Sequence, residues 1–226
     1  MSATGAPLER DRAAPTDERA VTAQRFLASL DDPIAQLART HGPVDFTQPS
    51  YGPAPPDHLG RLALSIVGQV ISARTARGIF ARLTEQLDGA LTADALARSR
   101  ESDLRATGIT QAKAKALRAL GAELTAGTFS FGELEQMNDT QAEARLVALH
   151  GIGPWSAQMF LLRSLGRPDI FPAGDLGLRR GIELLDGLTA IPSIAEARRR
   201  GLRWRPYRSY AAKYLWLQYI ARPPGS

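Results

Sequence analysis

Two short motifs in the C-terminal half carry the residues whose types and spacing suggest chemistry. The first, 149-LHGIGPWSAQMFLLRSLG-166, places two glycines around an isoleucine at the start of a helical pattern; the second, 171-FPAGDLGLRRG-181, holds a single acid, Asp175. Glycines allow positive φ and leave backbone N–H groups open at a helix start, where a phosphate can bind. An acid just before a helix is also typical of an N-cap. The two motifs therefore predict an anion-binding turn and a carboxylate held by the backbone.

The elements around these motifs are predicted to be helices. Apolar residues at i, i+3, i+4 and i+7 predict a helix that begins near Leu59. The same pattern continues through Val70 and Ile71 and predicts that both are buried. Ser72 and Thr110 are expected N-caps, and capping boxes are expected at Thr140–Glu143 and Ser193–Glu196. A last helix is expected from about Pro206 to Ile220. Because strand alternation is absent, the fold class is all-α, with about ten helices.

Composition and the positions of proline-rich segments predict the domain organisation. Residues 1–19 are polar, charged and without periodicity, which predicts a disordered leader, and residues 20–226 form one compact unit. Within it we expect two helical lobes beside a cleft: one of about 20–57 plus 140–226, the other of about 58–139. The proline-rich segment 44–57 is expected to cross between them.

Composition excludes several classes of protein. The absence of cysteine rules out disulfides, Cys-ligated zinc and iron–sulfur clusters, and the three histidines are scattered. A membrane span and a signal peptide are not predicted, so the expected location is the bacterial cytoplasm, near the nucleoid by activity. The net charge of +5 and the arginines between Arg179 and Arg208 suit a polyanion as partner, although a solvated Arg-rich face is an equally good interpretation.

Helix, Gly-Ile-Gly turn and helix is the form of a helix-hairpin-helix, which grips a nucleic-acid backbone without reading its sequence. Leu149 and Ile152 are expected to anchor it in the core, and Gly151, Gly153 and Ser156 to contact DNA phosphates. The carbonyls of Val147, Leu149 and Ile152 are candidate ligands for a Na⁺ or K⁺ ion; no other cofactor is expected.

Together with 66-IVGQVISARTA-76 and 204-WRPYRSYAAKYLW-216, these motifs resemble the helix-hairpin-helix DNA glycosylase superfamily, in its alkylbase branch of the 3-methyladenine DNA glycosylase II type. The resemblance covers roughly residues 58 to 220. It implies an enzyme that flips an alkylated purine, such as 3-methyladenine or 7-methylguanine, out of double-stranded DNA and hydrolyses its glycosidic bond in base excision repair. The expected state is a monomer acting on damaged DNA.

The resemblance also assigns roles to single residues. Asp175 is the catalytic carboxylate, and Trp155, Met159, Trp216, Tyr207 and Tyr210 are expected to line the base pocket. Val70, with Ile71 or Gln69 as alternatives, is the expected wedge that fills the gap left by the flipped base. Ser72 and Arg208 are further expected DNA-backbone contacts. The lysine of the strand-cutting enzymes is replaced by Trp155, which predicts a monofunctional hydrolase that leaves an abasic site.

Three alternatives stay open at this stage. The hairpin and basic face could belong to a non-catalytic DNA-binding protein, or the same fold could act on a mismatched adenine or a uracil. An α-helical protein-interaction domain is the third. The lesion spectrum is also open, because etheno-adenine or hypoxanthine would need only a differently shaped pocket.

Overall fold

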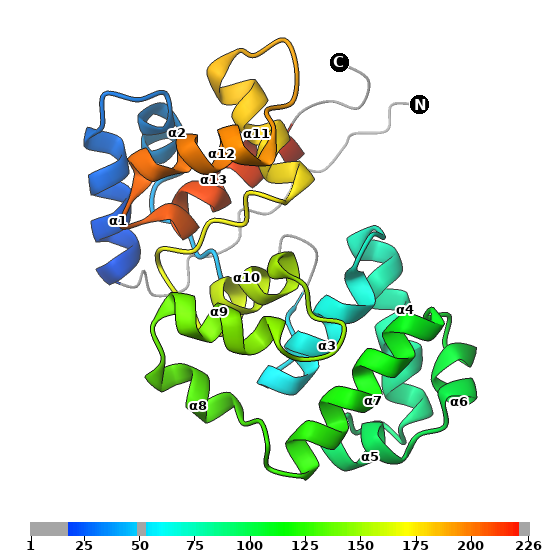
Figure 1. The fold of residues 1–226 in the computed structure, drawn as a ribbon. Helices are drawn as coiled ribbons and strands as arrows, with labels where there is room; N and C mark the ends of the chain where they lie inside the picture. Colours follow the sequence, from blue (N-terminus) through cyan, green and yellow to red (C-terminus); the bar gives the residue numbers. More distant parts are fainter. Residues whose placement is uncertain (1–17, 49–52, 222–226) are drawn as a thin grey trace, which may run out of the picture.

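The structure, a computed structural model, describes residues 18–48 and 53–221 and is helical throughout these ranges (Figure 1). The expected leader lies outside the described residues except at Glu18 and Arg19, which already belong to the first helix. The α-helices are α1 Glu18–Ser29, α2 Ile34–His41, α3 His58–Gly68, α4 Ala73–Gln86, α5 Ala93–Arg98, α6 Glu101–Ala106, α7 Gln111–Thr125, α8 Phe131–Gln136, α9 Asp139–Val147, α10 Pro154–Arg163, α11 Leu176–Asp186, α12 Ile194–Gly201 and α13 Arg208–Ile220, with a 3₁₀ turn at Leu202–Trp204.

Side-chain caps set the starts of most helices. Ser72 and Thr110 accept the N3 backbone N–H of α4 and α7, and Ser193 forms the expected capping box with Glu196 at α12. The second expected box, Thr140–Glu143, is wrong: α9 is capped two residues earlier, by Asn138 with Gln141. Because Asn is among the strongest N-caps, it starts the helix ahead of Thr140.

The helices form two groups (Figure 1). One group holds α1, α2 and α11 to α13, with α13 packed against α11 and α2; the other holds α3 to α10, with α7 packed against α5 and α3. The expected boundary at residue 140 differs from this arrangement, because α9 packs on α10 and α10 packs on α3. The hairpin therefore belongs to the same group as α3, while Asp175 begins a helix of the other group.

A buried ion-pair network stabilises the first group. Arg200 of α12 donates to Asp32 at 2.6 and 2.9 Å and to Asp186 at 2.7 and 2.8 Å, and the Asp32 side chain is only 1% exposed. Trp204 packs beneath the guanidinium, whose carbon lies 4.7 Å from the ring centroid. These contacts join α11 and α12 to the turn before α2, which supports the wall that carries Asp175.

Among the described residues, none of the helices has the length and apolar character needed to cross a membrane.

Candidate active site

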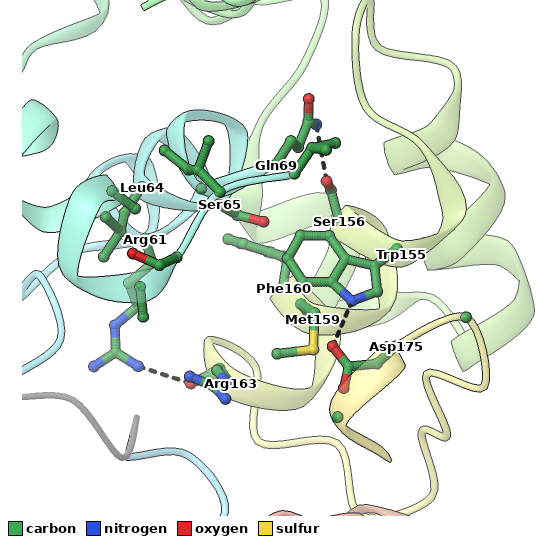
Figure 2. Close-up of a pocket in the computed structure, with 18 of the residues that line it drawn as sticks. Arg61, Leu64, Ser65, Gln69, Trp155, Ser156, Met159, Phe160, Arg163 and Asp175 are labelled. Carbon is green, nitrogen blue, oxygen red and sulfur yellow. Dashed lines mark hydrogen bonds between the residues drawn. The ribbon is translucent and has the colours of Figure 1, made fainter. Parts of the chain in front are cut away.

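Asp175 has both carboxylate oxygens engaged. As the N-cap of α11 it accepts the Leu178 backbone N–H at 2.8 Å. The Trp155 indole Nε1–H donates to the other oxygen at 3.0 Å (Figure 2). The Trp216 indole Nε1–H donates to the first oxygen at 2.9 Å. Three donors from α10, α11 and α13 thus orient one carboxylate. The same side chain caps α11 and is held in place by the two tryptophans.

A cavity of about 1100 Å³ opens at this carboxylate. It brings together most of the residues singled out in the sequence: Gln69, Val70, Ile71, Ser72, Gly151, Gly153, Trp155, Ser156, Met159, Asp175 and Trp216 all line it. The lining comes from both helix groups, since α3, α4 and α10 supply one side and α11 and α13 the other. The cavity is large enough for a purine, since ligand sites span about 300 to 1000 Å³.

Arg163 is a lining residue that the sequence interpretation missed. It follows Trp155 and Met159 at helical spacing on α10, and its guanidinium carbon lies 5.3 Å from the centroid of the Trp216 ring. Arg61 of α3 donates to the Arg163 carbonyl at 2.8 Å, which ties α3 to the end of α10 (Figure 2). The i, i+4, i+8 spacing of residues 155, 159 and 163 was the signal that could have found it.

The Gly-Ile-Gly turn has the expected hairpin geometry. Gly151 adopts φ 79°, Leu149 and Ile152 are buried, and Gly153 is the N-cap of α10 with no side chain over the first turn. A Cβ on Gly151 would lie 2.5 Å from the Ala116 Cβ of α7, so the turn also needs glycine for close packing. Gly153, Trp155 and Ser156 at the start of α10 line the cavity, while a cation at the three carbonyls stays a prediction.

Val70 corrects the sequence interpretation of the preceding helix. Helix α3 ends at Gly68, and Val70 is fully exposed with φ 61°, while Ile71 is 37% exposed. The apolar periodicity thus runs past the end of the helix, and burial of Val70 and Ile71 was the wrong expectation. Gln69 is partly buried, and its side-chain amide donates to the Gly151 carbonyl and to Ser156 Oγ of the hairpin.

Two of the predicted pocket residues lie away from this cavity, and Arg208, the predicted DNA-backbone contact, is paired with an aspartate of this chain. Tyr207 and Tyr210 do not line this cavity: their rings pack edge-on against Phe26, at 5.3 Å, and Phe46, at 4.5 Å. Arg208 is held by Asp169, with Nε–Oδ1 at 2.7 Å, and its side chain is only 16% exposed. These residues stabilise the start of α13, where the spacing of aromatic and basic residues does not distinguish packing from a site.

Apolar residues at the mouth of the cavity were also missed. Leu176, directly after Asp175, is 54% exposed, and Tyr219 and Ile220 at the end of α13 are exposed beside it. An isolated apolar residue at the first position of a helix gives no periodic signal, so the sequence alone did not indicate them.

A Gly-Ile-Gly hairpin lies beside a carboxylate that two tryptophans hold at one cavity, which is the helix-hairpin-helix arrangement that the sequence predicts. Residues 63–206 match the HhH-GPD superfamily of base excision DNA repair proteins, and the chain belongs to this family.

Solved structures and curated relatives agree with this assignment. A DNA-3-methyladenine glycosidase from Bacillus halodurans is 31% identical, with a TM-score of 0.73 over 92% of this chain and 90% of that one. A 3-methyladenine DNA glycosylase from Schizosaccharomyces pombe, bound to abasic DNA, is 26% identical, with a TM-score of 0.77 over 86% and 95%. A DNA-3-methyladenine glycosylase from Bacillus subtilis is 33% identical over 121 residues, which are 54% of this chain and 40% of the relative. The chain spans 15% to 40% of the length of the first curated relatives it matches.

Proposed function

We propose that the protein is a monofunctional DNA glycosylase that binds damaged double-stranded DNA, flips an alkylated purine into the cavity and hydrolyses its glycosidic bond. The observation that carries the proposal is Asp175, held by two indole N–H groups and one backbone N–H at the mouth of the cavity. The names of the relatives described above support the same reaction and substrate class.

The carboxylate fits the charge that develops in this reaction. As the base departs, positive charge builds on the sugar, and a fixed carboxylate stabilises it and orients the attacking water. Three donors keep Asp175 in one orientation, so little reorganisation is needed when the charge appears. The leaving base needs no strong general acid when alkylation has already made it cationic.

The lining supports hydrolysis without strand cleavage. Among the described residues that line the cavity there is no lysine, the residue type that would form a Schiff base with the sugar. Trp155 stands at the corresponding place after the hairpin, and its ring offers an electron-rich face to a cationic base. The proposed product is an intact strand with an abasic site.

Arg163 favours a second substrate class for the same hydrolase. Its guanidinium already lies over the Trp216 ring, where a second cation would be repelled. A neutral lesion such as hypoxanthine or etheno-adenine would instead meet a hydrogen-bond donor there. Replacing Arg163 by methionine should raise the rate on 7-methylguanine relative to hypoxanthine if the arginine sets this preference. An unchanged ratio would remove Arg163 from the account of specificity.

The test of the main proposal compares base release from duplex DNA containing 7-methylguanine by the wild type and Asp175→Asn. Asparagine caps a helix as well as aspartate, so folding should be retained while the rate falls by about 10² to 10³ fold. Asp57→Asn is the matched control: Asp57 also caps a helix, by accepting the Gly60 N–H at 2.6 Å, and does not line the cavity.

Strand breaks are scored with and without hot alkali. Breaks that need alkali and vanish only in Asp175→Asn support the proposal. Breaks without alkali would contradict the monofunctional assignment. Binding without base release by the wild type, on 7-methylguanine and 3-methyladenine alike, would favour a non-catalytic DNA-binding protein.

A further inference from the structure

The turn between α3 and α4 holds an exposed apolar side chain in an unusual conformation. Val70 is fully exposed, and its φ of 61° lies in the left-handed region, which β-branched residues rarely adopt. Such a conformation persists only where the surrounding contacts determine it. Two side chains make these contacts: Lys113 from α7 and Gln69 from the turn itself.

Lys113 of α7 holds the backbone on one side of the turn. Its ammonium donates to the carbonyls of Val67 and Gln69, both at 2.8 Å. Val67 lies in the last turn of α3, where helix carbonyls lack intrahelical partners and a cation is favoured. Burial lowers the pKa of Lys113, as expected for an ammonium enclosed between two helices.

Gln69 ties the same turn to the hairpin. Its amide nitrogen donates to Ser156 Oγ at 3.0 Å (Figure 2) and to the Gly151 carbonyl at 3.1 Å. Ser156 is buried in the first turn of α10, and Gly151 is the left-handed residue of the hairpin. The residue next to Val70 is therefore hydrogen-bonded directly to the element that would grip the DNA backbone.

We propose that Lys113 and Gln69 are positioning residues that fix Val70 relative to the hairpin, so that the grip on the DNA backbone determines where Val70 enters the base stack. The inference rests on the proposed function. Neither side chain is among the donors to Asp175: Lys113 holds the turn's carbonyls, and Gln69 connects the turn to Gly151. Their effect should therefore appear in base flipping and not in bond cleavage.

The experiment separates flipping from cleavage by changing the substrate. Flipping costs a few kcal/mol in a paired duplex and least where the base is already unpaired. Single-turnover base release is measured on 7-methylguanine paired with cytosine and on the same lesion in a one-nucleotide bulge. The readout is the ratio of the two rates within one protein preparation, which does not depend on the fraction of protein that is folded.

The variants are Lys113→Met and Gln69→Met, which keep side-chain length but remove the donors, with Val70→Gly as the reference for loss of the wedge. Lys115→Met is the matched control, since Lys115 is exposed on the same helix and carries the same charge. The duplex-to-bulge ratio should fall about tenfold or more in the first three proteins, as for a loss of about 1.4 kcal/mol, and stay at the wild-type value in the control.

The outcomes distinguish failure of the positioning role from failure of the proposed glycosylase activity. A low ratio with a near-normal bulge rate supports the positioning role. Equal losses on both substrates, or no loss on the duplex, would overturn it while leaving the glycosylase assignment intact. No base release by the wild type from either substrate would overturn the proposed function and this inference with it.

Discussion

The hairpin offers a stability prediction in which two glycines two residues apart behave differently. Gly151→Ala places a methyl group 2.5 Å from the Ala116 Cβ and keeps φ at 79°. The left-handed conformation costs about 1 to 2 kcal/mol for a non-glycine residue, and overpacking costs about 1 to 3 kcal/mol. The free energy of unfolding should therefore fall by about 2 to 5 kcal/mol.

Gly153→Ala is the matched control for this substitution. Gly153 has φ −91°, and a Cβ there meets nothing within 4 Å, so strain and overlap are both absent. Alanine is a poorer N-cap than glycine but restricts the unfolded chain, and these effects nearly cancel, leaving a change within about 1 kcal/mol. Because its new methyl group would sit where a phosphate approaches α10, DNA affinity should fall instead.

A double-mutant cycle isolates the steric overlap between the methyl group added at Gly151 and the Ala116 side chain. Ala116→Gly alone should cost about 0.5 to 1 kcal/mol, the usual penalty for glycine inside a helix. In the double variant Gly151→Ala/Ala116→Gly the overlap is gone, so about 1 to 3 kcal/mol should be recovered relative to the sum of the single variants. The assay is equilibrium urea unfolding of the four proteins. Equal stability of Gly151→Ala and Gly153→Ala, or no recovery of stability in the double variant, would refute the packing of the hairpin against α7.

Three further predictions concern the carboxylate and the ion-pair network. Trp216→Phe keeps an aromatic ring but removes a charge-assisted hydrogen bond to Asp175, so single-turnover base release should slow by about tenfold or more with DNA affinity kept, measured by fluorescence anisotropy. Arg200→Met removes the closest cation from the part-buried Asp186 and from the buried Asp32, which keeps only Arg203 at 3.5 Å, and should lower the free energy of unfolding by about 3 kcal/mol or more in urea titrations. Burial alone would raise the pKa of Asp32, but hydrogen bonds from Arg200 and the Ile34 N–H hold that pKa below its usual value. Its contribution to stability is therefore present at neutral pH and lost as pH falls below about 4, and urea titrations should show a weaker acid dependence in Asp32→Asn.

Local patterns allowed much of the fold and site to be predicted from the sequence. Capping residues such as Ser72, Thr110 and Ser193 act on the next helical turn, so their role depends on few other residues. The Gly-Ile-Gly turn and the acid before α11 are local in the same sense. These features fixed the positions of the hairpin and of Asp175 along the chain.

Features that depend on distant contacts could not be predicted in this way. The apolar pattern of α3 continues through Val70, and only the turn at Gly68, held by Lys113 from 44 to 46 residues away, brings Val70 to the surface. The aromatic spacing of α13 likewise gives no indication that Tyr210 packs on Phe46 whereas Trp216 reaches Asp175. Residue type alone does not reveal which side of a buried helix faces a cavity.

The position of Trp155 links DNA docking to the carboxylate. The first turn of α10 presents the backbone N–H groups of the hairpin, and the same turn carries the indole that donates to Asp175. No flexible segment separates these two groups, so a shift of the hairpin relative to α11 would move the donor away from the carboxylate. Substitutions that loosen the hairpin should consequently lower the single-turnover rate at saturating enzyme as well as the affinity for DNA. A variant that loosens the hairpin, such as Gly151→Ala, and loses affinity alone would show that binding and catalysis are mechanically independent in this fold.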